Sequence, residues 1–206
     1  HDRGSMARKQ GGRGHITSMA AALAVAVAVL FLAGAPRTAQ AAVMAASAGI
    51  EEACRGAADR DAAVDYEHCV ASLSSDAEGR DAADMHALAA AATRMAVEHA
   101  AATEARMEGL GEAEGSPRAR ARLGRCTELY GAAADVLRDA LDNIRARVYG
   151  RAVEQIAAAL GAAERCEDAW KGEEVARGGG GVPVAGHDKE YGRLAVVALG
   201  ITSGIA

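Results

Sequence analysis

The side chains best suited to chemistry in this sequence of 206 residues are four cysteines. Cysteines form disulfides in an oxidising compartment, or they bind a metal ion as thiolates. The spacing does not favour a zinc site, because no two of these cysteines stand two to four residues apart. Three disulfide pairings remain, and we expect the one that joins neighbours along the chain, Cys54 with Cys69 and Cys126 with Cys166. Each of these pairs flanks the midpoint of a predicted helical hairpin.

Other motifs typical of an active site do not occur in the sequence. It contains no Gly-x-Ser-x-Gly elbow and no His-Glu-x-x-His motif. The glycine run 178–181 lacks the Gly-Lys-Ser/Thr ending of a phosphate-binding loop. His86 and His99 are too far apart to share one face of a helix as metal ligands, and we expect His68, beside Cys69, to be an exposed polar residue. The sequence therefore predicts a protein that is not an enzyme, with no catalytic residue, no cofactor and no metal site.

The clearest structural pattern is a helical hairpin between Leu123 and Trp170. Its first half repeats apolar residues in steps of three and four, as a packed helix does, and its second half continues a compatible pattern. The two halves meet around residues 146–150, which interrupt two alanine-rich, helix-favouring runs. In an antiparallel pair, Cys126 and Cys166 then lie about 30 Å from the turn, each on its own helix. The apolar residues of the first half are Leu123, Cys126, Tyr130, Ala133, Leu137, Ala140 and Ile144.

Three further helical segments complete the expected fold. A short hairpin with a polar midpoint at 59–61 is predicted within residues 42–75. A long helix is predicted from Asp76 to Leu110, ending before a new helix start at Ser116-Pro117. A last helix begins at His187, with Tyr191, Leu194, Ala198 and Ile201 at helical spacing. The sequence thus predicts an all-α fold, an up-and-down four-helix bundle over residues 76–206 preceded by a small disulfide-linked helical hairpin over residues 42–75. The apolar seam of the long helix is expected to comprise Met85, Leu88, Ala92, Met95, His99 and Ala102.

Residues 1–41 are expected to lie outside this fold. His1–Ser5 precede the first methionine and are expected to be a cloning remnant or the end of a fragment. Basic residues, an apolar run over 19–35 and the sequence Ala39-Gln40-Ala41 then predict a secretory signal peptide with cleavage after Ala41. The alternative is a membrane anchor, but Gly34 and Pro36 end the apolar run short of the roughly 20 residues that a span needs. We expect no membrane association after cleavage.

Charge restricts the class of partner. Residues 1–41 carry five basic and one acidic side chain, so their removal takes the formal net charge from −5 to −9. Such an acidic protein is a poor candidate for binding nucleic acid, whose phosphates need Lys and Arg. Four carboxylates are expected on the outer side of the hairpin's first helix, where they could dock a basic protein. The alternative is that they are the solvated side of a bundle helix. They are Glu128, Asp135, Asp139 and Asp142.

Several segments resemble one known family, that of the plant pectin methylesterase inhibitors and invertase inhibitors. The resemblance covers nearly all of residues 50–204, and the four cysteines fall in the family's order. It departs from the family pattern at 64–68, where many relatives have Thr and Pro. The segments that carry it are Asp65–Asp76, Cys126–Tyr130, Cys166–Trp170 and Gly186–Leu194, together with Leu137, Ala140 and Leu141.

The resemblance implies a function and a location. It implies a protein secreted to the apoplast or cell wall that blocks a carbohydrate-active enzyme by a one-to-one complex over the substrate cleft. It also implies that the first cysteine pairs with the second and the third with the fourth. Members that inhibit acid invertase look like they carry a Pro-Lys-Phe motif in a bundle loop, whereas the loop here reads Arg145-Ala146-Arg147-Val148-Tyr149. That difference favours pectin methylesterase as the partner over acid (cell-wall or vacuolar) invertase. A helical carrier of an apolar ligand, and a diverged member without inhibitory activity, remain alternatives.

Overall fold

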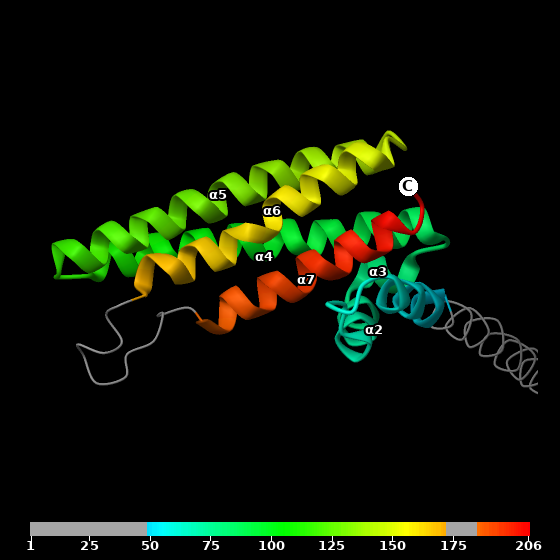
Figure 1. Cartoon of the computed structure of the whole chain (residues 1–206), viewed down its shortest axis with the longest axis horizontal. Coiled ribbons are helices and arrows are strands. Elements are labelled where there is room, and N and C mark those ends of the chain that lie inside the picture. The colour runs from blue at the N-terminus through cyan, green and yellow to red at the C-terminus, as the bar shows by residue number, and fades with distance from the viewer. Residues whose placement is uncertain (1–48, 172–184) are drawn as a thin grey trace, which may run out of the picture. The chain divides into compact units, whose positions relative to one another are not determined.

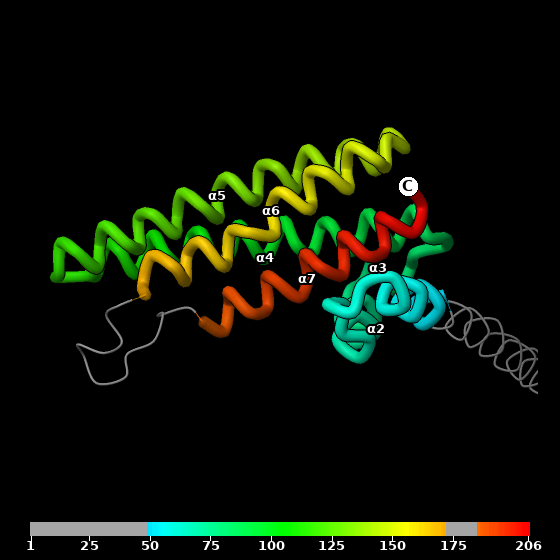
Figure 2. The backbone as a smooth tube through the Cα atoms, in the orientation of Figure 1, coloured from blue at the N-terminus to red at the C-terminus, as the bar shows by residue number. Residues whose placement is uncertain are grey.

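Four long helices form the main body of this computed structural model, which describes residues 49–171 and 185–206 (Figures 1 and 2). They are α4 (Met85–Ala113), α5 (Pro117–Arg145), α6 (Tyr149–Trp170) and α7 (Ala185–Ser203). Each helix packs against the next along the chain, and α7 packs back against α4, which closes the bundle. The described residues contain no strand, so the all-α, four-helix fold is confirmed. The signal peptide predicted over residues 1–41 and the glycine run 178–181 lie outside the described residues.

The predicted helical hairpin is formed by α5 and α6. Ser116 caps α5 by accepting a hydrogen bond from the backbone N–H of Ala119, and Pro117 occupies its first turn. A turn of three residues, 146–148, joins the two helices. Cys126 and Cys166 form a disulfide across this hairpin, with their Cα atoms 4.9 Å apart. Cys126 and Cys166 therefore lie at the same level of the two antiparallel helices, as expected from their equal distances along the chain from the turn.

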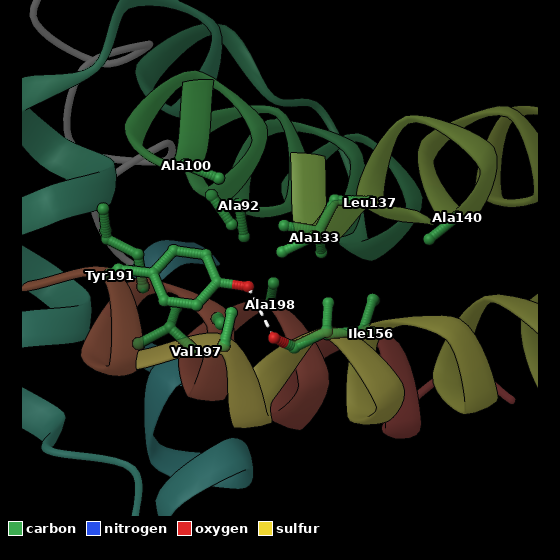
Figure 3. Close-up of a cluster of buried hydrophobic side chains, with 14 of the residues drawn as sticks. Ala92, Ala100, Ala133, Leu137, Ala140, Ile156, Tyr191, Val197 and Ala198 are labelled. Carbon is green, nitrogen blue, oxygen red and sulfur yellow. Dashed lines mark hydrogen bonds between the residues drawn. The ribbon is translucent and has the colours of Figure 1, made fainter. Parts of the chain in front are cut away.

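The bundle core is built mainly from small side chains. Ala92 and Ala100 of α4, Ala133 and Ala140 of α5 and Ala198 of α7 are almost completely buried and let the helix backbones approach closely (Figure 3). Larger side chains fill the remaining space between them. Among these are Leu137, Ile156, Tyr191 and Val197. The low aromatic content of the sequence is thus compatible with a filled interior.

The long helix predicted from Asp76 to Leu110 is interrupted, so this prediction is wrong in detail. A short helix, α3 (Ala77–Asp81), ends at Asp81, and α4 begins after Asp84. The Asp84 carboxylate accepts a hydrogen bond of 2.8 Å from the backbone N–H of Ala87, which starts a new helix there. The C-terminal end of α4 extends to Ala113, through the glycine-containing segment where a break was expected. Ala102, expected on the apolar seam, is exposed.

The N-terminal hairpin consists of a helical segment at residues 49–60 and α2 (Tyr66–Ser75), joined by the Cys54–Cys69 disulfide. Its tip packs against the C-terminal part of α7. Gly200 allows this approach, since a Cβ atom there would lie 3.0 Å from side-chain atoms of both Ala57 and Val64. The division into domains at residues 75 and 76 stays a prediction, although α2 does end at Ser75.

Side-chain contacts hold the hairpin in place. Arg60 donates a hydrogen bond of 3.0 Å to the backbone carbonyl of Gly200. Arg94 of α4 forms ion pairs with Asp76, the residue between α2 and α3, with Glu78 of α3 and with Glu98 of its own helix. Burial alone would raise the pKa of Asp76, but the hydrogen bond from Arg94 and the backbone N–H of Gly79 outweigh it and lower the pKa below its usual value. The hairpin is therefore fixed to the bundle through both α4 and α7.

Candidate functional site

The four carboxylates expected to meet a partner all lie on the exposed side of α5. Three of them form ion pairs with arginines on the same helix, so the surface carries both signs of charge. These pairs are Arg125–Glu128, Arg138–Asp135 and Arg145–Asp142. Asp139 is exposed and has no ion pair with another described residue. We call Glu128, Asp135, Asp139 and Asp142 the α5 carboxylates.

The arginine pairs leave these carboxylates available to a partner. All six side chains in the pairs are more than half exposed, and an exposed ion pair of this kind is worth at most about 1 kcal/mol. Over its whole length α5 carries six arginines and four acidic residues. A partner that docks here would therefore meet alternating charges, which favours recognition by charge position over attraction by net charge.

The turn between α5 and α6 has an unusual residue at its left-handed position. The backbone N–H of Arg147 donates to the carbonyl of Ile144, and that of Val148 donates to the carbonyl of Asn143, both at 2.8 Å. This pair of hydrogen bonds is the Schellman ending of a helix, in which glycine usually occupies the position with positive φ. Here Arg147 occupies it with φ 62°, and it is the one non-glycine residue with positive φ in the described part of the chain. The turn therefore stores backbone strain of about 1 kcal/mol.

Exposed side chains surround this strained turn. Val148 is 46% exposed and is the one large apolar side chain classed as exposed within residues 49–171 and 185–206. Arg147 donates a hydrogen bond of 3.2 Å to the hydroxyl of Tyr149, and that hydroxyl also lies 3.0 Å from Nδ1 of His86 on α4. The end of the α5–α6 hairpin is thus held in one conformation and presents an apolar side chain beside cationic ones. We call residues 145–149 the hairpin tip.

A second polar cluster lies inside the bundle. Asp188, in the first turn of α7, is only 1% exposed, and its Oδ1 accepts a hydrogen bond of 2.5 Å from the hydroxyl of Tyr130 on α5. The rings of Tyr130 and Tyr191 meet edge to face, with centroids 5.2 Å apart. The hydroxyl of Tyr191 donates a hydrogen bond of 2.8 Å to the carbonyl of Ala159, drawn as the dashed line in Figure 3. The cluster therefore links α5, α6 and α7.

Burial controls the protonation of this cluster. The pKa of Asp188 is raised to about 6, chiefly by burial; the hydrogen bond donated by the Tyr130 hydroxyl acts against this rise, and the nearby charge of Glu167 adds to it. The pKa values of Tyr130 and Tyr191 are raised above their usual range, in both cases chiefly by burial. Both tyrosines are therefore neutral hydrogen-bond donors at any physiological pH.

The described residues show no place for a metal ion or a membrane span. No group of three or more His, Cys, Asp or Glu side chains within them is arranged to hold a metal ion. No helix in the same ranges is both long and apolar enough to cross a bilayer. An open groove of about 350 Å³ lies where α4 ends and α5 begins, and its lining is partly charged. It is lined by Met107, Glu108, Gly111, Glu112, Arg120, Gly124 and Thr127.

Comparison with known proteins decides the family. The family model described as plant invertase/pectin methylesterase inhibitor matches residues 48–201. The chain belongs to this family. The resemblance noted in the sequence is therefore confirmed, and the family is one of enzyme inhibitors whose partners are proteins.

Relatives of this inhibitor-family chain carry the names of both kinds of inhibitor. Pectinesterase inhibitor 8 of Oryza sativa subsp. japonica is 34% identical over 155 residues, which cover 74% of this chain and 81% of the relative. A protein of Platanus acerifolia that carries the name of an invertase inhibitor is 27% identical over 153 residues, which cover 74% of this chain and 83% of the relative. Among solved structures, a mutant form of a pectin methylesterase inhibitor from Arabidopsis is 21% identical. It has a TM-score of 0.57 and covers 67% of this chain and 88% of its own, which supports the same fold.

The structure also corrects one expectation about a histidine in this inhibitor-family chain. His68 was expected to be an exposed polar residue, but its side chain is 9% exposed. It lies 3.3 Å from the hydroxyl of Ser72 and 3.5 Å from the carboxylate of Glu190 on α7. His68 therefore joins the hairpin to the bundle. Its contact with Ser72 could have been predicted from the sequence, because the two residues stand four apart on one helix.

Proposed function

We propose that this chain is a secreted inhibitor of pectin methylesterase that acts in the apoplast or cell wall and catalyses no reaction itself. The observation that carries the proposal is the similarity to rice pectinesterase inhibitor 8, at 34% identity over 155 residues. The plane-tree relative with the name of an invertase inhibitor has a lower identity, 27% over 153 residues. The inhibitor would act by covering the substrate cleft of the enzyme in a one-to-one complex.

The hairpin tip supports the choice of enzyme. It contains no proline, since the chain's three prolines are Pro36, Pro117 and Pro183. A Pro-Lys-Phe motif of the kind expected in an invertase inhibitor is therefore absent from this turn. Its conformation depends instead on Arg147 in the left-handed region, with two backbone hydrogen bonds closing the turn.

The α5 carboxylates are the proposed contact with a basic rim on the enzyme. They lie on one exposed side of a helix whose other side is packed into the bundle, so their spacing is fixed by the fold. Because neighbouring arginines alternate with them, the complementary surface should carry acidic groups between its basic ones. This pattern would give the complex a defined register along α5.

Inhibition of acid invertase is the second candidate function, and the plane-tree relative is the observation that favours it. A helical carrier of an apolar ligand is a third. The buried alanines of α4, α5 and α7 bring the helix backbones close together and so disfavour a carrier with a large internal site. Binding of a fluorescent lipid to the protein, with displacement of the probe by an unlabelled lipid, would support the carrier function.

Complex formation tests the proposal directly. The oxidised protein is mixed with a plant pectin methylesterase, or with a plant acid invertase, and each mixture is separated by size-exclusion chromatography with light scattering. We expect a one-to-one complex with the esterase and separate peaks with the invertase. A complex with the invertase and separate peaks with the esterase would reject pectin methylesterase as the target. Secretion is tested by expressing the chain with residues 1–41 in a plant cell, where the secreted protein should begin at Ala42.

A further inference from the structure

The buried carboxylate of Asp188 has no part in the docking surface proposed above. It lies in the first turn of α7, inside the bundle, and only one of its two oxygen atoms has a hydrogen-bond partner among the described residues. Oδ1 accepts the bond from Tyr130, whereas Oδ2 is buried and has none. An ionised carboxylate buried with one unpartnered oxygen is unfavourable, because it has lost the water that would solvate it.

The groups around Asp188 come from each of the helices packed near it. Tyr130 of α5 donates the hydrogen bond, and Glu167 of α6 adds a like charge that opposes ionisation. On α4, His99 lies 3.0 Å from the backbone carbonyl of His187. The pKa of His187 is lowered by burial and, to a smaller extent, by the charge of Arg106 on α4. Burial raises the pKa of Tyr191, and the charge of Arg165 on α6 partly offsets this rise. The ring of Tyr191 contacts the ring of Tyr130.

No cation in this set pairs with the Asp188 carboxylate in the described structure. The N-terminal end of a helix favours a negative charge, but this effect is smaller than the cost of complete burial. Asp188 therefore fits its site best when it is protonated. The first turn of α7 is attached to α5 by the Tyr130–Asp188 contact and to α4 by the hydrogen bond between His99 and the carbonyl of His187.

We propose that the buried carboxyl group of Asp188 makes the docking of the first two turns of α7 depend on pH, with tight docking when Asp188 is protonated and looser docking when it is ionised. The sign follows from the pKa of Asp188, which is about 6 in the closed structure and is close to its ordinary value, near 4, once the carboxyl reaches water. The docked state then binds more protons than the open state, so docking weakens as pH rises from about 4 to 6. Above pH 6 the effect reaches a plateau.

Amide hydrogen exchange measures this docking in the full oxidised chain. Exchange rates of the amides at residues 189–196 are followed from pH 4 to 7 and corrected for the intrinsic effect of pH on exchange, with the central amides of α5 as an internal reference. We expect the corrected protection of the α7 amides to fall by roughly fortyfold, most of it below pH 6. Protection in α5 should change much less.

Three variants assign the effect to one carboxyl group. Asp188→Asn, which resembles the protonated state in shape and charge, should give α7 protection that does not change with pH. Tyr130→Phe removes the donor that lowers the pKa of Asp188, so the plateau should begin at a higher pH. His187→Gln is the matched control, since the carbonyl that meets His99 belongs to the backbone, and it should leave the curve unchanged.

The opposite results would overturn the proposal. A pH-dependent loss of protection that persists in Asp188→Asn, or that disappears in His187→Gln, would assign the effect to another group. If Asp188→Asn does not fold, an unshifted curve in Tyr130→Phe would still contradict it. None of these measurements needs a partner enzyme, so their outcome is independent of the proposed inhibitory function.

Discussion

Cys126 and Cys166 are forty residues apart in the chain, yet their Cα atoms lie 4.9 Å apart and their sulfur atoms are bonded. The disulfide joins α5 to α6 about twenty residues from the turn on each side, so it links the two helices far from the turn that connects them. In the described structure the other disulfide, Cys54–Cys69, closes a much shorter loop, with a sequence separation of 15. The two bonds should therefore differ in how much they stabilise the fold.

Removal of the longer cross-link should be the more damaging. In the chain-entropy model the Cys126–Cys166 bond contributes about 4 kcal/mol and the Cys54–Cys69 bond about 3 kcal/mol to the free energy of unfolding. We expect the double variant C126A/C166A to lose more stability than C54A/C69A in urea unfolding followed by circular dichroism. Equal losses, or a larger loss for C54A/C69A, would show that chain entropy does not determine the order.

Substitution of Arg147 by glycine should stabilise the protein. Glycine adopts the left-handed conformation of this turn without the steric cost that an arginine side chain meets, so Arg147→Gly should raise the free energy of unfolding by about 1 kcal/mol. The matched control is Ala146→Gly at the preceding position, which has right-handed φ and ψ and should lose stability instead. A loss of stability in Arg147→Gly would mean that the side chain contributes more than its backbone strain costs.

Alanine substitutions at two glycines of α7 should change the stability of the protein in opposite directions. A Cβ atom at Gly200 would lie 3.0 Å from Ala57 and Val64 of the hairpin, whereas a Cβ atom at Gly192 would meet nothing within 4 Å. We expect Gly192→Ala to stabilise the protein by about 1 kcal/mol through helix propensity. Gly200→Ala should destabilise it by about 1 kcal/mol, because the close contact costs more than the propensity gains. Stabilisation by both in thermal unfolding would show that the hairpin adjusts freely.

Reversal of two α5 carboxylates should weaken inhibition. The variant D135K/D139K changes two exposed charges one turn apart on α5, and E108K/E112K makes the same change on α4 as a matched control. If the α5 carboxylates meet a basic rim, the first variant should lose at least tenfold in affinity for pectin methylesterase, while the control should change little. Both should unfold close to the wild-type temperature, since the one ion pair lost from α5 is exposed. Unchanged affinity in D135K/D139K would remove these residues from the contact.

The bundle and its disulfides could be predicted because they follow from spacing. Cys126 and Cys166 stand equally far from the turn, and this symmetry brings them together in any antiparallel pair. The start of α5 was visible in Ser116-Pro117, since both residues favour the first turn of a helix for local reasons. The break before α4 was missed because alanine-rich sequence continues across it. Asp84 was nevertheless a usable signal, since an aspartate directly before a run of apolar residues is a common helix cap.

Details that depend on tertiary contacts could not be read in the same way. Nothing in the sequence shows that Arg147 adopts the left-handed conformation, because glycine is the residue expected there. The ion pairs of α5 were detectable, because each arginine stands three residues from its carboxylate. The burial of Asp188 was also detectable in part, since it falls three residues before Tyr191 on the same helical face. Its contact with Tyr130 joins residues 58 apart and required the structure.

The most direct test of the account is an inhibition titration. The oxidised protein is titrated in parallel against fixed amounts of a plant pectin methylesterase and a plant acid invertase at mildly acidic pH, with enzyme concentrations well above the expected dissociation constant. We predict a linear loss of esterase activity that reaches its end point at one inhibitor per enzyme, and no loss of invertase activity. Loss of invertase activity alone, or no effect on either enzyme from folded protein, would contradict the proposed function.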